Sequence, residues 1–166
     1  RSGTDRCAKA IELIDGDVFV NIQGDEPLIN PDAIDTLVDN FDKSIGIGNA
    51  YVYVNDNYKL HDSNVVKVVT DLRNNAVYYS RYGIPFHKKE EVPFKQQLGL
   101  YAFNRHMLEL FVELEVGELE KAESVEMLRY VENGFAVKMI EVEDHGLSVD
   151  TQEDLKRVEE FLNAVH

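Results

Sequence analysis

The stretch Asp17 to Ile22 (DVFVNI) constrains the fold more than any other part of the sequence. It is a short run of β-branched and aromatic residues that stops at Gln23 and Gly24, and such a run is typical of a buried strand that ends in a tight turn. Two adjacent carboxylates, Asp25 and Glu26, follow this turn. Ligands of open α/β sheets bind at the carboxyl ends of strands, so the turn is a candidate ligand site.

The rest of the chain alternates between strand-like and helix-like stretches. Asn30 before Pro31 predicts a helix start, because asparagine can cap a helix whose first residue is proline. Further strands are expected at Ile47 to Val54, Val65 to Thr70, Ala76 to Ser80, Leu98 to Phe103 and Phe135 to Val142. Helices are expected at Arg105 to Leu114, Lys121 to Glu132 and Thr151 to Val165. This alternation predicts one α/β domain over residues 1–166, with a mixed, mostly parallel sheet flanked by helices.

The charge balance excludes several classes of partner. The chain carries 31 acidic against 17 basic residues, a formal net charge of -14, and therefore repels polyanions such as DNA and RNA. No apolar stretch approaches the ~20 residues that cross a bilayer, and no signal-peptide pattern opens the chain. We therefore expect a cytoplasmic protein without a membrane or nucleic-acid partner, and the lone Cys7 agrees with a reducing compartment.

Two aspartates at junctions between elements are candidate metal ligands. Asp25 follows the first strand, and Asp150 lies in SVDTQEDL, immediately before the last expected helix. They could meet and hold Mg²⁺, which prefers oxygen ligands and is often shared with substrate phosphates. Alternatively, Asp25 shapes a turn and Asp150 supports the helix N-terminus through the helix dipole. Spacing alone does not decide between these interpretations.

Seven segments, taken in order, resemble the 3-deoxy-manno-octulosonate cytidylyltransferase (CMP-Kdo synthetase) family. The segments run from one end of the chain to the other: SGTDR (Ser2 to Arg6), NIQGDEPLI (Asn21 to Ile29), VVKVVTD (Val65 to Asp71), YYSRYGIP (Tyr78 to Pro85), QLGLYAF (Gln97 to Phe103), ESVEMLRYVENG (Glu123 to Gly134) and SVDTQEDL (Ser148 to Leu155).

The resemblance implies a fold and a reaction. The fold is a nucleotidyltransferase (GT-A-like) domain. In the reaction, the anomeric hydroxyl of a 3-deoxy-ulosonic acid attacks the α-phosphorus of CTP, giving a CMP-sugar and pyrophosphate. Such a transfer needs charge neutralisation and positioning, which Mg²⁺ on Asp25 and Asp150 would supply. The family further implies a role in lipopolysaccharide or capsule precursor supply, and a homodimer with the exposed excursion from Gly83 to Phe94 at the contact.

The resemblance also implies the nucleotide site. In this family the SGTDR segment lines the nucleotide pocket. Arg6 is therefore expected near the base or phosphates of CTP, with Ser2 and Asp5 shaping the loop.

The sugar site is implied by further residues. By similarity Gln23, Tyr101 and Glu126 contact the ulosonic acid, and Arg81 is a catalytic-site residue that binds the sugar carboxylate with two hydrogen bonds. Each has a structural alternative. Arg81 could be an exposed loop arginine, Tyr101 a core tyrosine, and Glu126 half of a surface pair with Arg129 one helical turn later.

Two positions near the sugar site depart from the family pattern. Gln97 stands where the family usually has a histidine, and Met127 stands where it usually has a glutamine. These departures leave the identity of the ulosonic acid open, and an amino-substituted sugar is one possibility.

Members of the family begin with a strand and a glycine- or serine-rich loop that binds the triphosphate, and nothing here matches that loop. The resemblance therefore implies an N-terminally truncated domain that binds CTP poorly by itself. Two other functions remain open: a sialic-acid-type cytidylyltransferase or other sugar nucleotidyltransferase, and a catalytically silent interaction domain.

Overall fold

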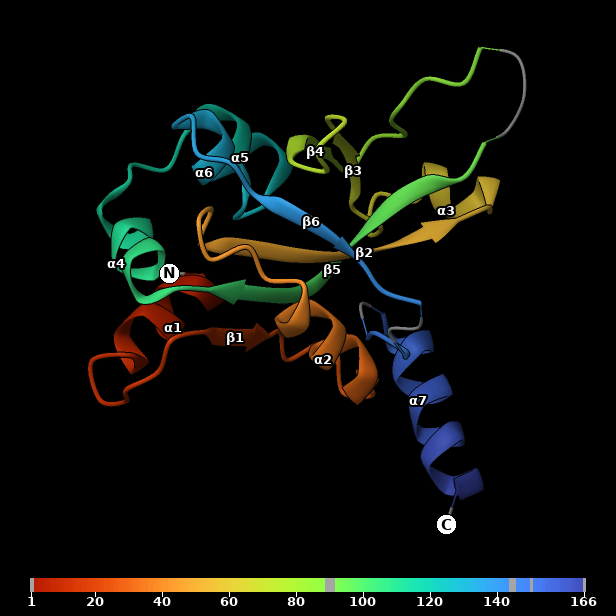
Figure 1. Cartoon of the computed structure of the whole chain (residues 1–166). Coiled ribbons are helices and arrows are strands. Elements are labelled where there is room, and N and C mark those ends of the chain that lie inside the picture. Colours follow the sequence, from red (N-terminus) through yellow and green to blue (C-terminus); the bar gives the residue numbers. More distant parts are fainter. Residues whose placement is uncertain (1, 89–91, 144–145, 150, 166) are drawn as a thin grey trace.

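A six-stranded sheet with helices on both faces forms the body of the molecule (Figure 1). The computed structural model describes residues 2–88, 92–143, 146–149 and 151–165. The strands are β1 (Phe19–Ile22), β2 (Ile47–Val54), β3 (Lys67–Thr70), β4 (Ala76–Ser80), β5 (Phe94–Phe103) and β6 (Lys138–Glu141). The helices are α1 (Gly3–Ala10), α2 (Pro31–Asp39), α3 (Asn57–His61), α4 (Arg105–Glu113), α5 (Glu118–Glu123), α6 (Leu128–Glu132) and α7 (Gln152–Val165).

The ten-residue strand β5 organises the sheet. One edge of β5 pairs with β2, and β6 pairs with the far edge of β2. The other edge of β5 is shared: its first half pairs with β3, which continues to β4, and its second half pairs with β1. The end of β1 and the start of β3 therefore meet beside the middle of β5.

The mixed α/β fold predicted from the sequence is confirmed, but the expectation of mostly parallel pairing is wrong for the strands that the structure describes. The pairings of β5 with β1, β2 and β3 are antiparallel, as is the pairing of β3 with β4, and the pairing of β2 with β6 is parallel. Strands β1, β2, β3 and β6 do run in one direction. Because β5 runs the other way and lies between β2 on one edge and β1 and β3 on the other, only β2 and β6 pair in parallel among the described strands.

Alternate residues of β5 enter two separate cores, as the period of two in a strand requires. Tyr101 and Phe103 pack with Leu108, Phe111 and other residues under α1, α4 and α6. On the opposite face, β5 packs against α2 through the buried residues Leu98, Leu100, Ala102, Ala33 and Leu37. The sheet is therefore covered on both faces, and its cavities must open at strand ends or edges.

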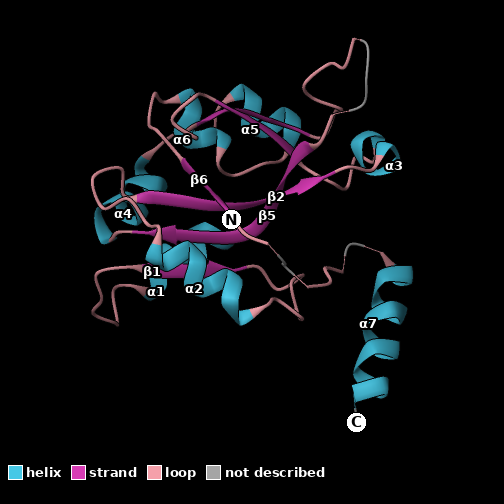
Figure 2. Ribbon diagram, turned by 45° about the vertical axis from the view of Figure 1, so that its right-hand side comes forward, coloured by secondary structure: helices cyan, strands magenta, loops and turns pink. Residues whose placement is uncertain are grey.

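Local sequence signals account for several element boundaries. The Asn30 side chain caps α2 by accepting the Asp32 N–H, with Pro31 as the first helical residue. The β3–β4 turn contains Asn74 in the left-handed conformation (φ 59°), as the turn-forming composition predicts. Thr151 and Asp154 form a capping box at the start of α7, in which the side chain of each residue accepts the backbone N–H of the other. Figure 2 shows α7 extending away from the sheet.

Three features of the helices differ from the expectation. The single helix predicted from Lys121 to Glu132 is two short helices, α5 and α6, because Ser124 adopts a left-handed conformation (φ 53°) that ends α5. Helix α1 begins in the SGTDR segment, which was expected to be a loop. Helix α3 was also missed. The four helices concerned, α1, α3, α5 and α6, are short, and the stability of short helices depends on tertiary contacts rather than on helix propensity.

Candidate functional site

A cavity of about 1390 Å³ opens where the end of β1 and the start of β3 meet beside β5. The Gln23 N–H donates to the Gly99 carbonyl at 2.9 Å, and the Gln97 N–H donates to the Val66 carbonyl at 2.8 Å. Gly99 lines the cavity between these two pairings. A Cβ atom at Gly99 would lie 3.1 Å from the Cβ atom of Gln23, so glycine allows the two segments to approach closely.

Two glutamines hold the hydroxyl of Tyr101 at the base of this cavity. Gln97 Nε2 donates to the hydroxyl at 2.8 Å, and Gln23 Nε2 donates to it at 3.4 Å. Burial raises the pKa of Tyr101, and the nearby Glu126 carboxylate raises it further. The hydroxyl therefore stays protonated at neutral pH and can donate a hydrogen bond to a ligand oxygen. The tyrosine expected at the sugar site does line the cavity.

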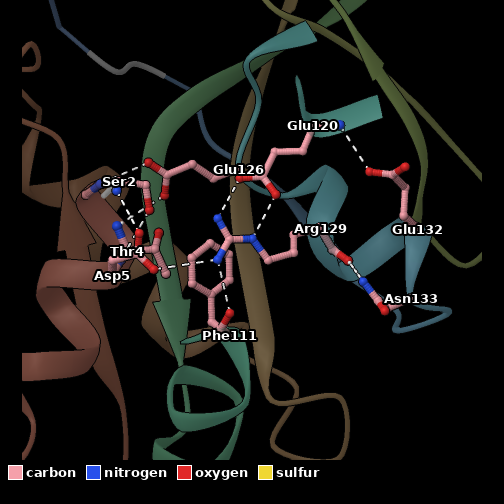
Figure 3. A network of polar contacts seen from close by, with 10 residues as sticks. Ser2, Thr4, Asp5, Phe111, Glu120, Glu126, Arg129, Glu132 and Asn133 are labelled. Atoms are coloured by element: carbon pink, nitrogen blue, oxygen red, sulfur yellow. Dashed lines mark hydrogen bonds and ion pairs between the residues drawn. The ribbon is translucent and has the colours of Figure 1, made fainter. Parts of the chain in front are cut away.

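Glu126 lies on the cavity wall, and helix α1 binds its carboxylate (Figure 3). The Gly3 N–H donates to Oε1 at 3.0 Å, and the Thr4 N–H donates to Oε2 at 3.1 Å. These are backbone donors of the first turn of α1, where the helix dipole favours a negative charge. Ser2 caps the same turn by accepting the Asp5 N–H at 3.2 Å. Ser2 and Asp5 thus support a helix N-terminus and do not line the cavity themselves.

Arg129 connects α6 to α1 and α5 behind this wall. Its guanidinium donates to both Glu120 carboxylate oxygens, at 2.7 and 2.6 Å, and lies 3.5 Å from Asp5 Oδ1. Burial would raise the pKa of Asp5, but the Ser2 N–H and the Arg129 charge lower it below its usual value. Arg129 is 4% exposed, so the alternative of a surface pair between Glu126 and Arg129 is wrong. The sequence spacing did not reveal Glu120 as the partner.

Arg81 follows β4 and lines the cavity. Its Nε donates to the Glu123 carbonyl at 2.7 Å, and its Nη1 donates to the Ser63 carbonyl at 2.8 Å. These two bonds use two of the five guanidinium donors, and the remaining N–H groups are on Nη1 and Nη2. The arrangement leaves the terminal edge of the guanidinium able to bind a carboxylate. Arg81 is half-buried, so it is not simply an exposed loop arginine.

Asp25 and Arg6 are both exposed, but they occupy different places. Asp25 lines the cavity, and its backbone carbonyl accepts the Val149 N–H at 2.8 Å. Arg6 lies on α1 and does not line the cavity. Asp150 lies outside the described residues.

No group of three or more histidine, cysteine, aspartate or glutamate side chains that could hold a metal occurs within the described ranges. In the same ranges no helix is long and apolar enough to cross a membrane.

Sequence reasoning missed two charged residues next to the cavity, Glu123 and Lys67. The Glu123 carboxylate accepts hydrogen bonds from Tyr78, Ser80 and the Arg81 N–H. The Lys67 ammonium is completely buried and donates to three backbone carbonyls, including that of Arg81. Both residues stand inside segments that carry the family resemblance, and this position was the signal that could have drawn attention to them.

The fold and the site together define a mixed α/β protein with a polar ligand cavity at the ends and edges of its strands. The chain belongs to the cytidylyltransferase family, whose model matches residues 1–161. This match extends over nearly the whole chain, and it agrees with the resemblance to 3-deoxy-manno-octulosonate cytidylyltransferases.

Relatives and solved structures agree with this assignment. The chain is 41% identical to the 3-deoxy-manno-octulosonate cytidylyltransferase of Solibacter usitatus over 98% of its length, and 42% identical to that of Chlorobaculum tepidum over 94%. It spans 66% of the length of each of these two relatives. These identities confirm the resemblance seen in the seven segments.

The structure of a CMP:2-keto-3-deoxy-manno-octonic acid synthetase complexed with CTP superposes with a TM-score of 0.92 and 30% identity, covering 100% of this chain and 70% of that one. An inositol-1-phosphate CTP transferase from T. maritima has a TM-score of 0.61 at 15% identity, covers 94% of this chain and 59% of its own, and shows the shared fold alone.

Proposed function

We propose that the protein transfers CMP from CTP to the anomeric hydroxyl of a 3-deoxy-ulosonic acid and releases pyrophosphate. One observation carries this proposal: residues from four separate segments of the sequence line a single cavity. They are Gln23, Asp25, Arg81, Gln97, Tyr101 and Glu126. The relatives named above are cytidylyltransferases for such a sugar, and they match nearly the whole chain.

The carboxylate of the sugar is the group that Arg81 would bind. The terminal N–H groups of a guanidinium match the two oxygens of a carboxylate, which a lysine cannot reproduce. Tyr101 would add a neutral hydroxyl donor, and the Gln23 and Gln97 side chains beside it would fix its direction. Holding the sugar in this way positions its hydroxyl for attack and lowers the entropic cost of the reaction.

Mg²⁺ is the proposed cofactor, held by Asp25 and Asp150. The Asp25 carboxylate fits this role because it lies at the cavity and makes no hydrogen bond or ion pair with the other described residues. One or two protein carboxylates together with substrate phosphates are a common donor set for Mg²⁺. When bound, the ion supplies charge neutralisation for the triphosphate.

The nucleotide would lie toward α1, where Arg6 offers an exposed guanidinium. Ser2 and Asp5 then act by holding the first turn of α1 through their reciprocal hydrogen bonds rather than by contacting CTP. An acidic protein of this kind needs a local cation to attract an anionic nucleotide, and Arg6 is the candidate.

We also propose a cytoplasmic homodimer. Tyr82, immediately before the excursion that follows β4, and Phe86 within it are 86% and 87% exposed. Large aromatic side chains at this exposure favour a protein contact over solvent.

Pyrophosphate release in the full-length protein tests the proposed reaction. CTP and Mg²⁺ are supplied with Kdo, 8-amino-Kdo or sialic acid in separate reactions, and Asp25→Asn is compared with Asp35→Asn, a matched change at an exposed aspartate of α2. We expect release with one 3-deoxy-ulosonic acid, abolished by Asp25→Asn and kept by Asp35→Asn. Release with sialic acid alone would move the protein to the sialic-acid-type enzymes, and no release with any sugar would favour an interaction domain.

A further inference from the structure

The break between α5 and α6 turns two glutamates toward different parts of the site. Ser124, with φ 53°, ends α5 after Glu123, and α6 begins at Leu128. In the short segment between the helices, Glu126 reaches α1, as described above. Glu123 reaches the other way, to the end of β4 and to Arg81.

Glu123 contacts Arg81 through both its side chain and its backbone. Its Oε2 accepts the Arg81 N–H at 2.8 Å, and its carbonyl accepts Arg81 Nε at 2.7 Å. Its Oε1 accepts the Tyr78 hydroxyl at 3.0 Å and the Ser80 hydroxyl at 2.8 Å. One residue therefore fixes the main chain and the guanidinium of Arg81 together.

Lys67 holds Arg81 from the other side. Its Nζ donates to the Arg81 carbonyl at 2.7 Å, and also to the carbonyls of Asp62 at 2.9 Å and Val65 at 2.7 Å. The Asp62–Val65 loop contains Ser63, whose carbonyl accepts Arg81 Nη1. The same buried ammonium thus orders both the backbone of Arg81 and the loop that holds its side chain.

We propose that Glu123 and Lys67 are positioning residues that aim the guanidinium of Arg81 into the cavity. Neither of them lines the cavity, so neither contacts the ligand directly. Their effect on the substrate passes through Arg81. This inference rests on the proposed function in one respect, namely that Arg81 binds the carboxylate of the sugar.

The chemistry of the two groups suits this role. A carboxylate has no donor of its own and can accept several hydrogen bonds at once, whereas an ammonium offers three donors to three carbonyls. Burial would raise the pKa of Glu123, but the Arg81 N–H and the Ser80 and Tyr78 hydroxyls lower it below its usual value. Glu123 is therefore ionised at neutral pH, with the charge that makes its hydrogen bonds strong.

The first test replaces the Glu123 carboxylate with an amide in the full-length protein. Glu123→Gln keeps the size of the side chain, and Glu109→Gln, at an exposed residue of α4, is the matched control. We expect the KM for the sugar to rise roughly tenfold in Glu123→Gln, with the KM for CTP unchanged, because misaimed donors weaken the contact to the carboxylate. With a sugar analogue that carries a carboxamide in place of the carboxylate, the two variants should perform alike.

An NMR measurement separates this inference from the proposed function. Hydrogen exchange at the Arg81 backbone N–H, which the Glu123 carboxylate accepts, should be faster in Glu123→Gln than in wild type and Glu109→Gln when it is measured without any ligand. If wild type releases no pyrophosphate with any sugar, the proposed function fails, and this exchange rate still decides whether Glu123 holds Arg81. An unchanged exchange rate, or equal rises in the KM values for sugar and CTP, would overturn the positioning role.

A milder variant covers the case in which Glu123→Gln does not fold. Ser80→Ala removes one of the hydrogen bonds to Glu123 and leaves the carboxylate in place. We expect the same change in sugar KM and in Arg81 exchange, by a smaller factor. A Ser80→Ala variant identical to wild type in both measurements would contradict the inference.

Discussion

Two arginines next to the α5–α6 break differ in how completely their guanidinium groups are bound. Arg129 donates to both oxygens of Glu120 and to the Phe111 carbonyl, and its Cζ lies 3.8 Å from the centre of the Phe111 ring. Arg81 uses two donors on backbone carbonyls and lines the cavity with the rest. The more completely bound arginine holds helices together, and the partly bound one is prepared for a ligand. If this division is correct, substitution of Arg129 lowers stability and substitution of Arg81 lowers activity toward the sugar.

The largest expected effect is on stability, from removal of Arg129. Arg129→Leu would leave Glu120, which is 8% exposed, as an unpaired buried carboxylate. Breaking a buried ion pair from one side costs about 3–5 kcal/mol. We expect the free energy of unfolding, measured by urea denaturation, to fall by this amount.

The double variant Arg129→Leu with Glu120→Leu provides the control for Arg129→Leu, because replacing both charges with apolar groups removes the unpaired charge. It should be more stable than the single variant. If the single variant lost less than about 1 kcal/mol, as exposed pairs do, the view of Arg129 as a structural arginine would be wrong.

The next effect is on activity, from Arg81→Lys. A lysine keeps the positive charge but loses the planar pair of N–H groups. We expect the kcat/KM for the sugar to fall roughly 30-fold, about 2 kcal/mol, while the free energy of unfolding changes by about 1 kcal/mol or less. The same substitution at the exposed Arg73, in the β3–β4 turn, is the control and should alter neither quantity. A loss of stability without a loss in kcat/KM would make Arg81 a second structural arginine.

A smaller effect is expected at Glu126, which connects the break to α1. In Glu126→Gln the amide cannot accept both the Gly3 and Thr4 N–H groups as the carboxylate does. Loss of the negative charge at a helix N-terminus costs about 1 kcal/mol. Thermal unfolding should show this loss, and hydrogen exchange at the Gly3 and Thr4 amides should accelerate. Unchanged exchange at these amides would show that α1 does not depend on Glu126.

Several parts of this arrangement follow from the sequence. The capped start of α2, the β3–β4 turn and the capping box of α7 depend on residues within a few positions of one another, and local patterns predict them. The family resemblance singled out six residues that line the cavity, and also Ser2, Asp5 and Arg6, which do not. These features could be predicted because each depends either on residues that are close together in the sequence or on a motif that the family shares.

The remaining features depend on contacts between distant residues. Glu126 and Gly3 are 123 positions apart, so no spacing rule predicts that the carboxylate binds the start of α1. The residues from Glu123 to Met127 are compatible with a helix, and the break at Ser124 is visible only once the partners of Glu123 are known. The insertion of β5 among strands of the opposite direction likewise follows from tertiary pairing and not from the pattern of any one strand.

The smallest expected effect is a pH dependence of stability at Asp5, whose carboxylate lies 3.5 Å from Arg129. The folded-state pKa of Asp5 lies below its usual value, because the Ser2 N–H and the Arg129 charge outweigh burial. A carboxyl group whose pKa is lowered by folding contributes stability above its unfolded pKa of about 3.9, and this contribution disappears as the pH falls through the folded pKa. Asp5→Asn should therefore reduce stability at pH 7 by about 0.2–1 kcal/mol, the range for partly exposed pairs.

The difference between wild type and Asp5→Asn should shrink as the pH falls below about 4, because protonated aspartic acid and asparagine are both neutral. Urea denaturation at pH values from 7 down to about 3 measures this difference. Asp35→Asn, at an exposed position, should give no such convergence. A difference that stayed constant with pH would show that the charge of Asp5 does not contribute to stability, and that Arg129 is held by Glu120 without help from Asp5.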